Sequence, residues 1–170
     1  FRYDGDPHGD HKAIFSGESA NFFIGKQPWG DPGIILQDGN GSNLIAETEA
    51  FTDGEFHHVA YSFLDLPEVG GHGWLFIDGE LLADSYMDGG AGAIWFGREN
   101  ESDGRPFHGI LDDVRISNTS RYTEDFIPTT DYEMDEFVVA HYVFNEGEEI
   151  TLFDHSGNSN HGTIEGAAWA

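Results

Sequence analysis

The sequence predicts an all-β protein folded as an antiparallel β-sandwich. Turn signals rich in Gly, Asn and Asp recur about every ten residues, with short apolar and aromatic runs between them. Segments with helical periodicity are nearly absent, and the chain has 23 Gly and 14% aromatic residues, a composition that suits short strands and tight turns. We therefore expect roughly a dozen strands, and that number implies a large sandwich.

The first half of the chain is expected to alternate short strands with polar turns. Asp38-Gly39-Asn40-Gly41 is the clearest turn, because its residues accept positive φ. The stretch 4–11 and the segment around Trp29 are expected to be loops. The expected strands of this half are 1–3, 13–15, 21–25, 33–37 and 44–50.

The second half contains the strongest hairpin signal, Asp78-Gly79 between two apolar runs. Such a pair favours a type I′ turn, whose twist matches that of the flanking strands. The segment from Ser120 to Phe126 is expected to form a single helical turn that ends before Pro128. The expected strands are 56–63, 74–77, 80–83, 93–97, 107–117, 137–144 and 150–153.

The apolar rhythm of strand 107–117 breaks at two adjacent carboxylates. Its apolar residues occupy odd positions up to Leu111 and even positions from Val114 onward, so a flat strand cannot place them on one face. A β-bulge at Asp112 and Asp113 would shift the alternation by one residue. Carboxylates at such a kink require a cation, a basic partner or backbone N–H donors.

A second group of oxygen ligands lies in the loop 154–163. Asp154, Asn158 and Asn160 follow one another at short spacing, which suits a hard cation, although an Asx turn bonded to its own backbone is the alternative. The chain has no Cys, so a metal could be held only by oxygen or His. Together with Asp112, and with Asp113 as the lesser candidate, this loop predicts a bipartite calcium site.

The charge of the chain restricts its partners. Asp and Glu number 32 against 7 Lys and Arg, giving a formal net charge of -25. A field of this sign repels nucleic acid and anionic membranes, and its self-repulsion should be relieved by salt or bound cations. Both a salt-adapted surface and an ordinary acidic surface fit this composition. There is no apolar run long enough for membrane insertion.

The sequence contains no recognisable catalytic motif. It lacks Cys and a Gly-x-Ser-x-Gly elbow, and the acids of 99–103 lie in a charged loop. No catalytic residue is therefore expected. The candidate ligand-binding residues are Trp29, Arg98 and Tyr86. Trp29 lies in a Gly- and Pro-containing loop, where an exposed ring can stack on a sugar.

Four segments together resemble the laminin-G-like domains of the concanavalin A-like lectin/glucanase superfamily. They are 53–60, 74–80, 107–116 and 154–162, with the Arg121-Tyr122-Thr123 continuation. The resemblance implies a jelly-roll sandwich, often calcium-bound, that acts extracellularly in glycan or protein binding. It places Asp112 at the recurrent acid of the strand, and Asp154 with Asn158 in the Asp-x-Ser-Gly-Asn loop.

One departure from the family pattern concerns the order of segments. In many members the Asp-x-Ser-Gly-Asn loop lies near the domain start, whereas here it is C-terminal and the chain begins with Phe1 in mid-pattern. We expect one domain, 1–170, cut from a longer secreted protein, with 137–169 filling the place of the opening strands. Alternatively, upstream strands lie outside this piece, or the C-terminal segment completes a neighbouring copy.

These observations predict a non-catalytic, calcium-supported binding module, secreted or on the cell surface. Its expected partner is a glycan or a cell-surface protein. The first alternative is a structural repeat of an adhesin or surface filament that self-associates by strand donation. A glycan-cleaving enzyme is the third, because the superfamily includes enzymes.

Overall fold

The structure, a computed structural model, describes residues 1–6, 12–17, 23–26, 32–37, 43–66, 68, 70–87, 93–98, 105–129, 131–148 and 150–170. Every regular element in these ranges is a β-strand, and every pairing is antiparallel. They include no helix that is long and apolar enough to cross a membrane. The predicted all-β fold is confirmed.

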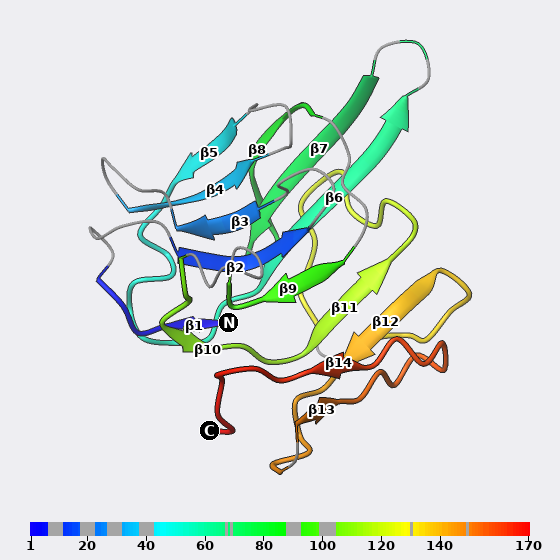
Figure 1. Cartoon of the computed structure of the whole chain (residues 1–170). Coiled ribbons are helices and arrows are strands. Elements are labelled where there is room, and N and C mark those ends of the chain that lie inside the picture. The colour runs from blue at the N-terminus through cyan, green and yellow to red at the C-terminus, as the bar shows by residue number, and fades with distance from the viewer. Residues whose placement is uncertain are drawn as a thin grey trace.

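Two sheets form the layers of a sandwich (Figure 1). One has the order β5-β4-β3-β2-β9, and the other has the order β6-β7-β8. The strands of the first sheet are β2 (Lys12–Gly17), β3 (Phe23–Lys26), β4 (Gly33–Gln37), β5 (Asn43–Glu47) and β9 (Ile94–Phe96). Those of the second are β6 (Val59–Leu66), β7 (Gly70–Ile77) and β8 (Glu80–Tyr86).

The main hydrophobic core lies between these two sheets. Ile34 and Leu36 of β4 and Leu75 of β7 are 0% exposed and belong to one cluster. Alternate residues of β4, β5 and β7 belong to this cluster, as the period of a half-buried strand requires. Burial of each such side chain contributes roughly 1.5–3 kcal/mol.

The β7–β8 hairpin has the turn that its sequence predicted. Asp78 and Gly79 both have positive φ, 51° and 82°, as a type I′ turn requires. A side chain at Gly79 would also overlap the carbonyl oxygen of Phe126, whose N–H donates to the Gly79 carbonyl at 2.9 Å. The turn therefore needs glycine for its backbone angle and for a tertiary contact.

The predicted strand 107–117 divides in two at its carboxylates. β10 (Gly109–Ile110) pairs with β1 (Arg2–Tyr3), whereas β11 (Val114–Ser117) pairs with β12 (Val138–Tyr142). Asp113, immediately before β11, has a left-handed φ of 53°. The expected interruption is present, but it separates two strands with different partners instead of forming a bulge within one.

The C-terminal segment forms a small layer beside β11. Besides β12 it contains β13 (Thr151–Leu152) and β14 (Gly162–Thr163), which pair with each other. A second hydrophobic cluster is centred on Ala140, Tyr142 and Leu152 and packs against Phe96 and Ile116. Figure 1 shows these strands following β11 at the lower right of the sandwich.

The helical turn predicted for 120–126 is wrong. The Tyr122 and Phe126 rings are instead stacked, 3.6 Å apart and 6° from parallel. The Tyr122 N–H donates to Ser62 Oγ at 2.9 Å, and the Phe126 N–H is used by Gly79. A tertiary hydrogen bond thus takes the Phe126 donor that a helical turn would have used.

Candidate functional site

A cavity of about 880 Å³ lies between the free edge of β6 and the segment that contains β11. Its walls include every residue of 58–63 and of 111–117. Because neighbouring side chains of a strand point to opposite faces, this continuous lining means that strand edges face the cavity. The volume lies within the range of small-ligand sites.

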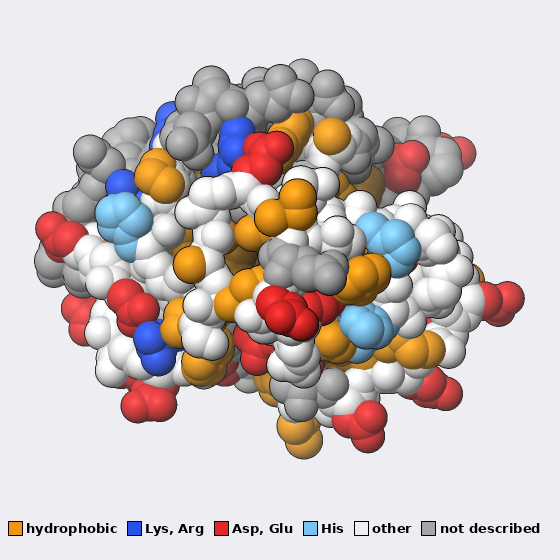
Figure 2. All heavy atoms as spheres, turned by 60° about the horizontal axis from the view of Figure 1, so that its bottom comes forward, with side chains coloured by type: hydrophobic (Ala, Val, Ile, Leu, Met, Phe, Trp, Pro, Cys, Tyr) orange, Lys and Arg blue, Asp and Glu red, His pale blue; other side chains and the backbone are white. Residues whose placement is uncertain are grey.

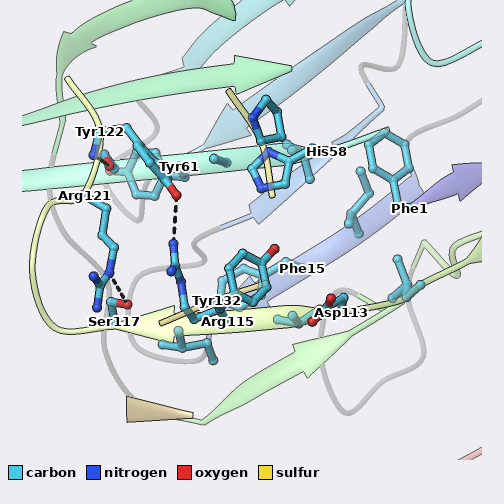
Figure 3. Close-up of a pocket in the computed structure, with 18 of the residues that line it drawn as sticks. Phe1, Phe15, His58, Tyr61, Asp113, Arg115, Ser117, Arg121, Tyr122 and Tyr132 are labelled. Carbon is cyan, nitrogen blue, oxygen red and sulfur yellow. Dashed lines mark hydrogen bonds between the residues drawn. The ribbon is translucent and has the colours of Figure 1, made fainter. Parts of the chain in front are cut away.

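The segment that follows β11 crosses the edge of β6 and bounds the cavity. Tyr122 is anchored there through Ser62, and Arg121 forms a two-pronged ion pair with Asp135, with N–O distances of 2.8 and 2.7 Å. The hydrogen bond to Arg121 lowers the pKa of Asp135 to about 2. Arg121 also donates to Ser117 Oγ at 2.8 Å (Figure 3).

Arg115 extends from β11 into the cavity (Figure 3). Its guanidinium carbon lies 4.3 Å from the centre of the Tyr132 ring, and its Nη2 donates to Tyr122 Oη at 2.9 Å. Within the described residues, this half-buried arginine has no carboxylate partner, whereas Arg2, Arg98 and Arg121 each have one. It therefore retains N–H donors for a ligand.

His58 contributes a neutral polar group to the same cavity. Burial lowers the pKa of its ring, so the imidazole is uncharged at neutral pH. Its Nδ1 is buried, and no hydrogen-bond partner for it is present among the described residues. The backbone N–H of His58 donates to Asp78 Oδ1 at 2.8 Å, which fixes its place at the start of β6. This unpartnered nitrogen belongs to a ring that lines the cavity.

His57 has the opposite environment to its neighbour. Its two ring nitrogens lie 2.7 Å from Asp78 Oδ2 and 2.9 Å from Asp53 Oδ1. Burial lowers the pKa of His57, but the two carboxylates outweigh it and raise the pKa overall. This ring holds the turn before β6 against the β7–β8 hairpin.

The cavity also has aromatic walls. Phe15 of β2, Tyr61 of β6, Tyr122 and Tyr132 all line it. Burial and the nearby Asp113 raise the pKa of Tyr132, so its hydroxyl keeps its proton at neutral pH. Aromatic faces beside a guanidinium and a neutral imidazole can contact both the C–H and the O–H groups of a sugar.

The acids predicted to bind calcium are distributed around His141 of β12. The Asp113 Oδ1 lies 2.9 Å from the His141 ring Nε2, and the Asp154 Oδ1 accepts the His141 backbone N–H at 2.9 Å. Asp112 is exposed at the cavity wall. The structure thus gives Asp113 a basic partner, the His141 ring, which is one of the alternatives expected for the carboxylates at the kink, whereas Asp154 accepts the backbone N–H of the same residue.

Asp154 is buried and organises its own loop. Its two oxygens accept the backbone N–H groups of Ser156 and Asn160 and the Ser156 hydroxyl, in addition to His141. Burial opposes ionisation, but these hydrogen bonds outweigh it and lower the pKa of Asp154 to about 2. Asn158 and Asn160 each donate to the Val139 carbonyl, at 3.1 and 2.9 Å.

Hydrogen bonds already use the carboxylate at the centre of the predicted calcium site. The Asp154 oxygens already accept N–H and O–H donors, and the Asn158 and Asn160 amides are directed to β12. The described residues contain no group of three or more His, Asp or Glu placed to hold a metal ion. The geometry is that of the alternative, an Asx-rich loop bonded to backbone. Calcium stays a prediction that only chelation can test.

The predicted ligand-binding residues are not gathered at the cavity. Trp29 lies outside the described residues. Arg98 pairs with Glu165 at 3.3 Å, and Tyr86 of β8 is 62% exposed; neither lines the cavity. Sequence reasoning missed Arg115, although an arginine within an apolar strand was an available signal. Tyr132 carried no such signal, because it lies in a connection without regular structure.

Comparison with known proteins identifies relatives of this fold. A laminin-G-type model of the concanavalin A-like lectin/glucanases superfamily matches residues 1–125. A solved protein from Bacteroides ovatus, provisionally named a carbohydrate binding protein, superimposes with a TM-score of 0.69 at 19% identity, covering 96% of this chain and 52% of that one. The chain therefore spans about half the length of that protein. No curated protein matches the sequence.

Proposed function

This chain belongs to the concanavalin A-like lectin/glucanases superfamily, and from that premise we propose that it is a non-catalytic carbohydrate-binding module. The observation on which the proposal depends is the lining of the cavity beside β6. There Arg115 and His58 offer hydrogen-bonding groups without a protein acid to satisfy them, and Tyr132 offers an aromatic face. The Bacteroides ovatus protein, named for carbohydrate binding, is consistent with this ligand class.

Binding without cleavage is supported by the positions of the acids. A glycosidase of the common type needs two carboxylates that face the scissile bond from opposite sides. Among the described residues, three acids line the cavity: Asp112 and Asp113 are adjacent in the chain, Asp113 is engaged by His141, and both Asp78 oxygens are engaged by His57 and His58. We place the module outside the cell, where polysaccharides and cell-surface glycans are accessible.

A glycan array followed by calorimetry tests this proposal. The wild-type protein should bind defined glycans, and Arg115→Gln should weaken the binding about tenfold, because a charge-assisted hydrogen bond contributes about 1.5–3 kcal/mol. Glu47→Gln, on the exposed end of β5, is the matched control and should bind as the wild type does. Wild-type protein that binds no glycan would contradict the function, and unchanged binding by Arg115→Gln would contradict the site.

A structural repeat that assembles by strand donation is the second candidate. It is favoured by the separate packing of the C-terminal segment, which pairs with the rest of the sandwich through β11–β12. An identical β12 from a second copy could occupy the same edge.

Engineered cysteines distinguish the two arrangements. Ile116 and Ala140 lie directly opposite each other in β11 and β12, and the chain has no native Cys. For a binding module we expect oxidised Ile116→Cys/Ala140→Cys to run as a cross-linked monomer at every concentration. Cross-linked dimers that increase with concentration would establish donation instead. The two single variants control for accidental pairing.

A further inference from the structure

The outer face of the β6-β7-β8 sheet is built differently at its two ends. Leu75 and Ile77 of β7 point into the core, so His72, Trp74 and Phe76 point to the opposite, outer face. Phe76 is fully buried because Tyr122 and Phe126 pack edge-on against it. This cover defines one end of the face, and the residues at the other end are His72 and Trp74.

The strand register places an aromatic group at that second end. His72 is paired with Tyr86 of β8, and Trp74 is paired with Asp84. Paired residues share a face of the sheet, and their side chains are direct neighbours. The ring of His72 lies 4.5 Å from that of Trp74 and 5.2 Å from that of Tyr86. The three rings are neighbours, and the planes of Trp74 and Tyr86 are inclined to that of His72 by 40° and 74°.

A carboxylate lies beside these rings. Asp84 Oδ2 is 2.7 Å from His72 Nε2, which fixes the imidazole between its two aromatic neighbours. The Asp84 side chain remains 49% exposed and Tyr86 is 62% exposed. The surface thus combines an accessible aromatic ring with a hydrogen-bond acceptor that His72 holds in place. Packing of the sandwich core does not require either group.

We propose that Trp74, Tyr86 and the His72–Asp84 pair form a second saccharide-binding site, on the outer face of the sheet. The inference rests on the proposed carbohydrate-binding function and adds a site outside the cavity. One sugar ring would lay its C–H face on the aromatic side chains, and its hydroxyls would donate to Asp84.

The ligand should be a neutral saccharide. A carboxylate at the site and a formal net charge of -25 both disfavour a uronic acid or a sulfated sugar. A protein partner is a poorer match, because stable interfaces bury about 800 Å² on each side, far more than a few side chains supply. The site fits one or two sugar units of a longer neutral chain.

Calorimetry with defined oligosaccharides tests the site. The probes are cellohexaose, xylohexaose and mannohexaose, with a hexamer of galacturonic acid as the charged comparison. Tyr86→Ala should weaken binding of a neutral probe about tenfold, whereas Tyr86→Phe, which keeps the ring, should stay within about twofold. Asp84→Asn should also weaken binding. Tyr86 is exposed, so these variants should fold, and thermal unfolding checks this.

A spectroscopic readout separates this site from the cavity. The indole N–H signals of the Trp residues are resolved by NMR, and Trp74→Phe assigns the one from Trp74. Titration of a neutral probe into Arg115→Gln should still shift the Trp74 signal, because the outer site is intact.

The outcomes are distinct for the two proposals. Wild-type affinity in Tyr86→Ala together with an unmoved Trp74 signal would overturn the outer site and leave the cavity proposal standing. Binding of the galacturonate hexamer alone would overturn the neutral ligand class. Failure of the wild-type protein to bind any neutral probe would overturn the outer site, whereas the glycan array remains the separate test of the cavity.

Discussion

Asp154 is the residue on which the C-terminal loop depends. It accepts hydrogen bonds from His141, Ser156 and Asn160, so it joins the loop to β12 while remaining buried. Asp154→Asn keeps the shape of the side chain but presents an NH2 group to N–H donors. We expect a loss of about 1–3 kcal/mol in the free energy of unfolding at neutral pH, measured by urea denaturation.

The same residue predicts a pH dependence. The pKa of Asp154 is about 2 in the folded protein, below the ordinary 3.8, so its stabilising contribution is complete above about pH 4 and is lost as the pH falls toward 2. The difference in the free energy of unfolding between the wild type and Asp154→Asn, measured in urea, should therefore become smaller as the pH falls from about 4 to 2. A gap of constant size down to pH 2 would show that the carboxylate charge contributes nothing.

At the scale of the element, the β7–β8 turn couples local geometry to a distant segment. Gly79 and Gly54 both have a φ of 82°, but a Cβ at Gly54 would meet no atom within 4 Å, whereas at Gly79 it would overlap the Phe126 carbonyl oxygen. A substitution at Gly54 therefore measures backbone strain alone, whereas a substitution at Gly79 measures backbone strain together with steric overlap.

We expect Gly54→Ala to lower the free energy of unfolding by about 1 kcal/mol, the usual cost of a non-glycine residue in the left-handed region. Gly79→Ala should cost clearly more, because the segment that covers Phe76 must also move. Chemical denaturation of both variants measures the difference. Equal losses of unfolding free energy in the two variants would mean that the Phe126 segment can move away from residue 79 without destabilising the fold.

The division of the predicted strand 107–117 into β10 and β11 also concerns secondary structure. The change of parity at Asp112-Asp113 was visible in the sequence, and the left-handed φ of Asp113 is its physical form. That β10 pairs with β1 and β11 with β12 was not visible, because an interruption does not determine the partner of either half.

At the scale of the whole molecule, charge is the dominant feature. Figure 2 shows acidic side chains distributed around the face turned toward the viewer, with few basic ones among them. Because the net charge is -25, mutual repulsion opposes the compact state. We expect the melting temperature to rise by several degrees between about 0.05 and 0.5 M NaCl, over which the screening length falls from roughly 14 to 4 Å.

Chelation tests calcium against general screening. At matched ionic strength, EDTA should leave the melting temperature unchanged, because hydrogen bonds close the Asp154 loop. A lower melting temperature in EDTA, restored by excess calcium, would establish the ion that the sequence predicted. Magnesium at equal concentration is the control for divalent screening.

The sequence was sufficient to predict the all-β class, the Asp78-Gly79 hairpin and the interruption before Val114. Each of these depends on the backbone preferences and the alternation of neighbouring residues, which are local properties. It also indicated that the carboxylates needed partners, without identifying them. The contacts of His141 with both Asp113 and Asp154, and of Arg115 with the Tyr132 ring, depend on the folded structure. Those contacts join segments distant in the chain, and alternation within one strand fixes only a face, not what packs against it.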